Sequence, residues 1–322
     1  MLKPPQIVAR LAPLLGRAVT LAGVMLLLAA SDDPAMAKDG TSDQPDDPPP
    51  TVQRIQDLYV SSRNTNSVKL YNGATGAYLG NFVAPGTGGL LAPQEVAFGY
   101  DGHLLVSARG NNAILKFDGA TGEYLGPFTT GYPLDEPTKM TFGPDSMLYV
   151  SQWGRFKGNV ARFNGRTGEY VDLATSSSLD RGMAHAWDAS GTMYLASFGT
   201  QDIRRFAPDG TDLGVFISGG DLTGAVNLWF GADSNLFVVD WTYGGIRRYD
   251  GATGSSLGVF VSGMARSEGF AFGPDSLLYV CDWQNNQIRR YNATTGVAVD
   301  IFATEGGLLQ PNSLVFGPVR DD

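Results

Sequence analysis

Six copies of one short apolar motif recur along this chain at nearly even spacing. Leu-Tyr-Val at residues 58–60 is its clearest form, and successive copies begin 46, 44, 45, 43 and 42 residues apart, at Leu58, Leu104, Leu148, Met193, Leu236 and Leu278. A period in this range, with several short strands in each copy, is typical of the blade of a β-propeller. The repeat therefore constrains the fold strongly and leaves the activity open.

Each copy reads as four short strands joined by tight turns. Before the third motif, a first strand ends in Met-Thr-Phe-Gly-Pro-Asp at residues 140–145, and a turn at Asp145 and Ser146 follows. The motif itself is the second strand, residues 246–249 exemplify the third, and the Leu-Gly-x-Phe pattern at 257–260 exemplifies the fourth. The third strands alternate apolar and polar residues, as expected for one buried face. Asp, Ser and Gly suit the short hairpin loops between strands.

The two ends of the repeat array predict a closed ring. The first copy starts at its second strand, and an additional inner-strand pattern, Asn-Ser-Leu-Val-Phe-Gly at residues 312–317, follows the last copy. Pairing this C-terminal strand with the three N-terminal strands completes one blade and removes exposed sheet edges. We therefore predict an all-β protein, a six-bladed β-propeller of four-stranded antiparallel blades closed by a C-terminal inner strand.

The N-terminus has the pattern of a targeting segment. Three basic residues, Lys3, Arg10 and Arg17, precede an apolar stretch at residues 18–30. Ala-Met-Ala at residues 35–37 then supplies the small residues of a signal-peptidase site. The sequence thus predicts a segment that is removed from the mature protein.

These features divide the chain into a signal peptide (1–37), a disordered acidic and Pro-rich linker (38–56) and a six-bladed propeller (57–322). The linker is rich in Asp, Pro, Ser and Thr and buries too little apolar surface to fold. The apolar stretch of the signal has thirteen residues, too few to span a bilayer comfortably. We expect a secreted or periplasmic protein without a stable membrane span, and anchoring by an uncleaved signal is the alternative.

The charge of the chain limits its partners. The formal charge is −9, and loss of three basic and two acidic residues with the signal changes it to −10. Such a surface disfavours nucleic acid, because phosphate binding needs an excess of Lys and Arg. The single cysteine, Cys281, excludes an intrachain disulfide. Stability must then come from the closed ring of sheets, and we expect a monomer.

The repeats resemble the NHL type. Tyr-Val-Cys-Asp at residues 279–282 and Asn-Gln-Ile-Arg-Arg-Tyr at 286–291 correspond to its Tyr-Val-Ala-Asp and Asn-x-Ile-x-Arg-Phe patterns, and residues 112–117 are a second example. The resemblance covers essentially the whole predicted propeller. It implies six blades and a shape similar to the regucalcin and gluconolactonase family. It does not imply one activity, because many functions share this scaffold.

A binding site is expected at one mouth of the central channel. The loops after the second and fourth strands vary in length and content, and variable loops on a rigid frame commonly carry binding sites. The ends of the second strands should form a rim there, made of Arg63, Arg109, Trp153, Phe198, Trp241 and Trp283. Aromatic and arginine side chains favour ligand binding. The alternative is that the aromatic residues only pack between blades.

Oxygen ligands concentrate on three consecutive blades, at Asn227, Asp240, Glu268, Asp282 and Asn312. Hard cations prefer such ligands, so Ca²⁺ is the one cofactor that the sequence suggests. The regucalcin-like family similarly uses a channel Glu with Asn and Asp ligands. Ser-Glu-Gly at residues 267–269 looks like its strand start, although Phe270 stands where that family has Pro. Alternatively, Asp240 and Asp282 bond backbone amides and hold their loops.

Two functions fit these observations. The first is a binding or scaffold module for a protein, peptide or glycan at the channel mouth. The second is a Ca²⁺-dependent, lactonase-like hydrolase, for which Glu268, Asp240 and His185 are the catalytic candidates. A complete catalytic constellation is absent from the sequence patterns, which favours the binding module.

Overall fold

The computed structural model describes residues 56–154 and 158–317, which lie in one compact unit, residues 52–322. The expected signal peptide and nearly all of the expected linker lie outside the described residues. In the part that is described, no helix is long and apolar enough to cross a membrane.

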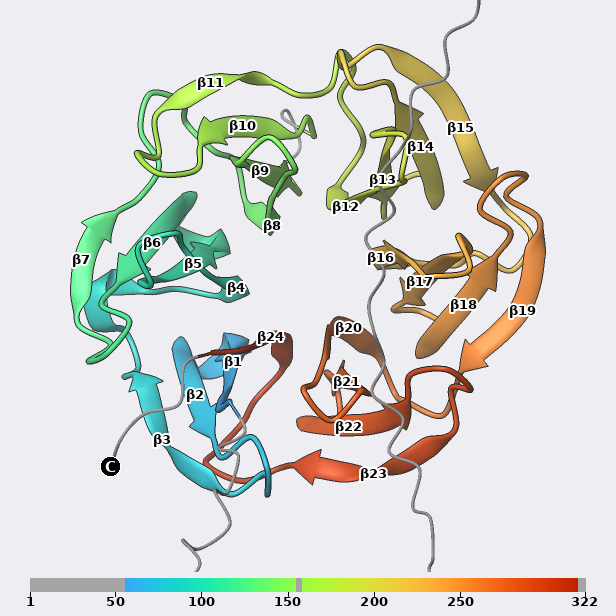
Figure 1. Ribbon diagram of the computed structural model, residues 1–322. Helices are drawn as coiled ribbons and strands as arrows, with labels where there is room; N and C mark the ends of the chain where they lie inside the picture. Colours follow the sequence, from blue (N-terminus) through green and yellow to red (C-terminus); the bar gives the residue numbers. More distant parts are fainter. Residues whose placement is uncertain (1–55, 155–157, 318–322) are drawn as a thin grey trace, which may run out of the picture. The chain divides into compact units, whose positions relative to one another are not determined.

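Six four-stranded sheets surround a central channel (Figure 1). The first blade contains β24 (Pro311–Phe316), β1 (Leu58–Ser62), β2 (Ser67–Tyr71) and β3 (Tyr78–Val83). The second contains β4 (Pro93–Phe98), β5 (Leu104–Ala108), β6 (Ala113–Phe117) and β7 (Tyr124–Pro127). The third contains β8 (Pro137–Phe142), β9 (Met147–Gln152), β10 (Ala161–Asn164) and β11 (Tyr170–Leu173).

The remaining three blades follow the same order from the channel outward. The fourth contains β12 (Gly182–Trp187), β13 (Met193–Ser197), β14 (Asp202–Phe206) and β15 (Asp212–Ser218). The fifth contains β16 (Ala225–Phe230), β17 (Leu236–Asp240), β18 (Gly245–Tyr249) and β19 (Ser256–Val261). The sixth contains β20 (Ser267–Phe272), β21 (Leu277–Asp282), β22 (Gln287–Asn292) and β23 (Ala298–Ala303). Three short 3₁₀ turns are also found, η1 (Arg63–Thr65), η2 (Thr87–Gly89) and η3 (Arg109–Asn111).

The predicted ring closure is confirmed. Strand β24 lies innermost in the first blade and pairs antiparallel with β1, with Leu58 opposite Phe316 and Val60 opposite Leu314. Figure 1 shows the red C-terminal strand beside the blue N-terminal strands. The first and last described strands thus share one sheet, and each of the six described blades has a paired inner strand.

The turn between the third and fourth strands locks neighbouring blades together. In the second blade, the Asp118 side chain accepts hydrogen bonds from the backbone N–H groups of Ala120 and Thr121, at 2.9 Å each. Gly122 closes this turn with a φ of 75°. A Cβ atom there would lie 1.9 Å from the carbonyl oxygen of Phe82 in the preceding blade, so only glycine fits.

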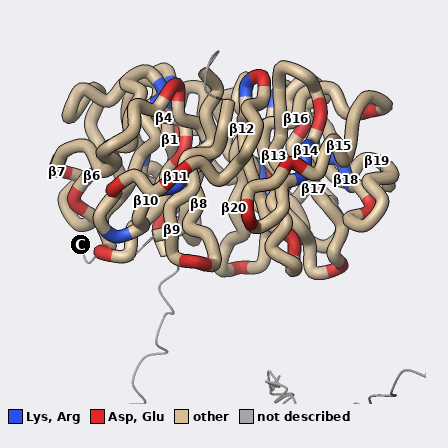
Figure 2. The backbone as a smooth tube through the Cα atoms, turned by 90° about the horizontal axis from the view of Figure 1, so that it is seen from above, with Lys and Arg blue, Asp and Glu red and all other residues tan. Residues whose placement is uncertain are grey.

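A bulge recurs in the pairing of every inner strand with its neighbour. The register shifts between Pro93 and Val96 in the second blade, and equivalent shifts occur in the other five. Bulges redirect side chains, and two successive residues, Gln94 and Glu95, consequently both line the channel. Seen from the side of the ring, acidic residues are found on both faces (Figure 2).

Candidate functional site

The six residues predicted for the rim line one pocket at a mouth of the channel. Its volume is about 500 Å³, and Glu268 lies in its wall with Asn64, Met183, Val226 and Gln310. Each rim residue follows the end of a second strand, as Trp153 follows β9 and Trp241 follows β17. The closed ring brings six positions together that are as much as 220 residues apart in sequence, from Arg63 to Trp283.

One backbone hydrogen bond, repeated six times, fixes the rim. In each blade the N–H of the rim residue donates to the carbonyl of the residue before the inner strand. Trp153 donates to Glu136 at 3.0 Å, and Trp283 donates to Arg266 at 2.7 Å. The row that accepts these bonds is Ala92, Glu136, Arg181, Gly224, Arg266 and Gln310. Sequence analysis missed this row, although alignment of the six copies marks it as the position before each inner strand.

The four aromatic rim residues form two contacting pairs. The rings of Trp153 and Phe198 are 5.1 Å apart, and those of Trp241 and Trp283 are 4.5 Å apart in an edge-to-face arrangement. Arg181 lies over Trp153 and Arg266 over Trp241, at 5.4 and 5.1 Å. The rings therefore pack on one another, as the packing alternative expects, and also line the pocket. Ligand contact by these rings stays a prediction.

The two rim arginines differ in their partners. Arg109 donates two hydrogen bonds to the carboxylate of Glu136, at 2.7 and 3.1 Å, and lies 4.7 Å from the centre of the Trp153 ring. Arg63 pairs with no carboxylate among the described residues. Burial lowers the pKa of Arg63, and the nearby charge of Arg109 lowers it further. The charges of Glu268 and Glu136 act in the opposite direction on this pKa, so Arg63 is a half-buried cation with carboxylates nearby but without an ion pair among the described residues.

Glu268 lies at the inner end of the pocket and is only 5% exposed. Its burial raises its pKa to about 7, although the hydrogen bond from Gln94 and the charges of Arg63 and Arg109 act in the opposite direction. Gln94 donates to Glu268 through its amide nitrogen and accepts a 2.7 Å hydrogen bond from Asn312 through its oxygen. This chain of bonds crosses between the sixth, second and first blades.

The channel narrows sharply beyond Glu268. The space lined by Gln94, Lys139, Asn227 and their neighbours has a volume of only about 10 Å³, close to the minimum for one water molecule. Lys139 closes it further through a 2.9 Å ion pair with Glu95. This part of the channel is therefore too small for a ligand of the size that fits the mouth pocket.

The five predicted metal ligands do not meet at one place. Asn227, Glu268 and Asn312 line the narrow channel, whereas Asp240 and Asp282 do not. The carboxylate of Asp240 accepts bonds from the N–H groups of Thr223 and Tyr243, as the loop-holding alternative requires. Asp282 likewise accepts bonds from Ala265, Asn285 and Gln287. Among the described residues, no group of three or more His, Cys, Asp or Glu side chains could hold a metal.

The three channel residues that remain do not fit Ca²⁺. This ion takes six to eight oxygen ligands, usually with several carboxylates. Here Glu268 is the one carboxylate of the three, and it already accepts a bond from Gln94. The Asn227 side-chain oxygen accepts the N–H of Leu228 at 3.0 Å. These three residues therefore do not form a calcium site by themselves.

The three catalytic candidates also lie apart. Only Glu268 lines the channel-mouth pocket, and Asp240 is engaged with its loop. His185 is buried, with its Nδ1 atom 2.7 Å from the Ser151 hydroxyl. Burial lowers the pKa of His185 to about 3, and the charge of Lys139 acts in the same direction. A neutral, enclosed imidazole contributes to packing, and its ring lies 5.0 Å from that of Trp187.

Comparison with solved structures places this chain among six-bladed propellers. A protein of unknown function from Bacteroides caccae matches with a TM-score of 0.63 and 15% identity, over 81% of this chain and 98% of that one. A chain of a nidogen/laminin complex matches with a TM-score of 0.66 and 14% identity, over 83% of this chain and 100% of that one. Virginiamycin B lyase from Staphylococcus aureus matches with a TM-score of 0.58 and 14% identity, over 83% of this chain and 91% of that one.

No protein-family model and no curated protein matches the sequence. The resemblance to NHL repeats and to the regucalcin-like family therefore stays a prediction. At 14–15% identity, the structural matches establish the six-bladed fold alone.

Proposed function

We propose that this protein is a secreted or periplasmic binding module whose channel-mouth pocket takes a small ligand with a carboxylate and a flat apolar face. One acidic sugar unit of a glycan has this chemistry. The observation that carries the proposal is Arg63, a cation that forms no ion pair with a carboxylate among the described residues and lines the same pocket as four aromatic rings. Arginine suits carboxylates because its guanidinium can donate two parallel hydrogen bonds.

The size of the pocket favours a small ligand. Its volume of about 500 Å³ falls within the usual range of roughly 300 to 1,000 Å³ for ligand pockets. A stable protein partner would instead need about 800 Å² of surface on each side. Because the adjoining space in the channel has a volume of only about 10 Å³, we propose that the pocket holds one unit of a longer chain and leaves the rest outside the ring.

Glu268 makes the pocket compatible with an anion near neutral pH. With a pKa of about 7, it is protonated for half of the time or more at pH 7 and below. It then repels a carboxylate less than an ordinary glutamate would. The hydrolase alternative has only this one of its three catalytic candidates in the pocket, so we favour binding.

Binding of an acidic and a neutral trisaccharide, trigalacturonate and maltotriose, tests the proposal by calorimetry at pH 6. We expect trigalacturonate to bind and Arg63→Gln to weaken it by about tenfold or more, since loss of a charged hydrogen bond costs on the order of 1.5 to 3 kcal/mol. The triple variant Trp153→Ala, Trp241→Ala, Trp283→Ala should abolish binding while the fold is kept. Arg290→Gln is the matched control, because Arg290 pairs with Asp300 outside the pocket.

Three results would contradict the proposal. Trigalacturonate could fail to bind, Arg63→Gln could bind it as tightly as the natural protein does, or maltotriose could bind equally well. If binding survives in the triple tryptophan variant, the rim serves packing alone.

A further inference from the structure

A contact of three aromatic rings is found at three of the junctions between blades. An aromatic residue of the second strand lies between a Phe of the fourth strand and a Phe of the next blade's inner strand. Tyr194 is 5.1 Å from Phe216 and 4.8 Å from Phe230. The same edge-to-face arrangement is found at Tyr59 with Phe82 and Phe98, and at Tyr279 with Phe302 and Phe316. These rings fill the junctions on the face opposite the channel-mouth pocket.

The second blade has Leu105 in place of the second-strand ring. The third blade keeps that ring, Tyr149, and lacks the ring of the fourth strand instead. The N–H of Ala174 donates to the carbonyl of Val160 at 2.8 Å, just as Phe128 donates to Ile114 at 2.7 Å in the second blade. Ala174 therefore stands at the position that is Phe in the other five blades, as at Phe216. The backbone register is kept, and one ring of the contact is missing.

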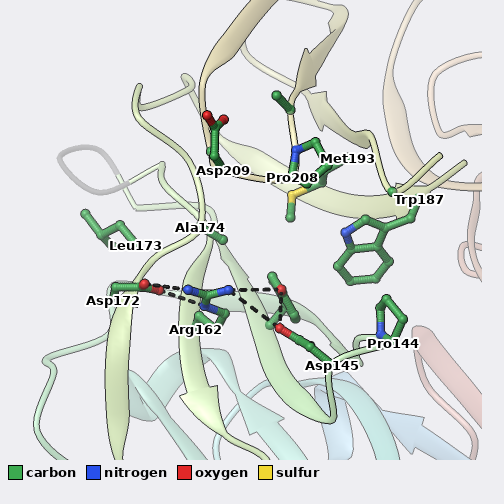
Figure 3. A pocket seen from close by; sticks show the side chains of 14 residues that line it. Pro144, Asp145, Arg162, Asp172, Leu173, Ala174, Trp187, Met193, Pro208 and Asp209 are labelled. Atoms are coloured by element: carbon green, nitrogen blue, oxygen red, sulfur yellow. Dashed lines mark hydrogen bonds and ion pairs between the residues drawn. The ribbon is translucent and has the colours of Figure 1, made fainter. Parts of the chain in front are cut away.

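A pocket of about 310 Å³ lies at this junction (Figure 3). Ala174 and Tyr149 line it from the third blade, and Trp187 and Met193 line it from the fourth. Tyr149 keeps its edge-to-face contact with Trp187, at 4.8 Å. Trp187 stands where the other five blades have Phe. Its larger ring does not fill the space beside Ala174.

Among the described residues, Arg162 at this junction has no aromatic ring of the fourth strand to lie against. In the fourth and sixth blades, Arg205 and Arg290 lie over the fourth-strand rings of Phe216 and Phe302, at 4.9 and 4.8 Å. The equivalent Arg162 lies in the pocket wall without such a ring. It is held in place by Asp172 and lies 3.5 Å from Asp145 (Figure 3).

We propose that this junction is a binding site for a phenyl ring, which restores the missing member of the three-ring contact. The ring enters beside Ala174, meets Tyr149 edge-to-face and lies against the guanidinium of Arg162. Asp145, Asp172 and Asp209 line the pocket against this single arginine, so the tail of the ligand is neutral or cationic. The site is separate from the channel mouth and does not depend on the function proposed there.

Ligand-observed NMR with 2-phenylethylamine tests the site. Two matched probes accompany it, 3-phenylpropanoate with the opposite charge and 2-cyclohexylethylamine without the aromatic ring. We expect the phenyl amine to bind more tightly than either. Ala174→Phe should weaken it by about tenfold or more, because the protein's own ring then fills the space. The melting temperature of this variant should not fall, and Ala174→Met serves as a second filling variant if the Phe variant does not fold.

The reciprocal change makes the test sharper. Phe302→Ala opens the equivalent place in the sixth blade, beside Tyr279 and Arg290, and should add a second binding site for 2-phenylethylamine. The natural phenyl ring could belong to a free amine or to a Phe side chain of a peptide. The tripeptide amide Lys-Phe-Lys distinguishes the two, because it binds more tightly than 2-phenylethylamine if the ring comes from a peptide. Unchanged binding in both filling variants, or equal binding of the cyclohexyl probe, would overturn the proposal.

Discussion

At the scale of single residues, burial outweighs nearby positive charge at Glu268. Two arginines and an amide hydrogen bond favour its ionised form, and desolvation is nevertheless the largest influence on its pKa. At Arg63 burial is likewise the largest influence, and it lowers the pKa although the charges of Glu268 and Glu136 raise it. Both groups are kept in costly environments at the channel mouth, which is typical of sites that bind or react.

Replacement of Glu268 by Gln should reduce the pH dependence of stability. The pKa of about 7 exceeds the ordinary value of 4.5, so the folded protein holds this proton more strongly than the unfolded chain does. The stabilising contribution is complete below about pH 4.5 and is lost as the pH rises through 7. The 2.5-unit difference between the two pKa values corresponds to on the order of 3 kcal/mol.

Urea unfolding at pH 5 and pH 8 measures this effect. We expect Glu268→Gln to remove most of the decrease in the free energy of unfolding between the two pH values. The exposed Glu123→Gln is the control for loss of one carboxylate. Equal pH dependence in all three proteins would show that Glu268 does not titrate in this range.

At the scale of elements, the loops that follow second strands are held by side chains at the strand ends. In β17 this residue is Asp240, which is fully buried and accepts bonds from Thr223, Tyr243 and Arg247. In β21 it is Asp282, with a similar set of donors. Trp241 and Trp283 come next in the chain, so these two carboxylates hold the loops that position both rim residues.

Asp240→Ala should therefore destabilise the protein strongly. Removal of a buried partner leaves Arg247 with the 3.4 Å contact to Asp221 as its one ion pair among the described residues, and such losses cost about 3–5 kcal/mol. Asp221→Ala is the matched control, because this exposed partner of the same arginine should contribute less than about 1 kcal/mol. Thermal unfolding of both variants measures the difference, and equal effects would contradict the assigned role of Asp240.

At the scale of the whole molecule, stability depends on the pairing of β24 with β1. Among the six described sheets, only the sheet of β24, β1, β2 and β3 joins segments so distant in sequence. Without β24, one blade would expose the edge of β1 to the channel, and the ring would be open. Exposed strand edges promote association between chains.

Deletion of residues 311–322 should accordingly unfold or aggregate the protein. Deletion of residues 318–322 alone leaves β24 intact and controls for shortening of the chain. Size-exclusion chromatography and thermal unfolding provide the readouts. A 311–322 deletion that stays monomeric with unchanged thermal stability would show that ring closure is dispensable.

Local sequence patterns were sufficient to predict the six blades, their four strands and the rim. Strand alternation and turn residues repeat six times, and averaging over copies removes the ambiguity of any one. The rim from Arg63 to Trp283 could be predicted because it occupies one position of the repeat. Ala174 could also be recognised in the sequence as a break in the Leu-Gly-x-Phe pattern, but its consequence could not.

The repeat by itself thus determined the architecture of this protein, because each copy encodes the same local strands and turns. Only the tertiary structure decided which polar residues face the channel. Asp240 and Glu268 looked like equal members of one cluster, yet the inner-strand bulge directs Glu268 inward while loop hydrogen bonds hold Asp240 away. The gap beside Ala174 likewise depends on rings from two blades, and contacts between blades are not encoded in any single copy.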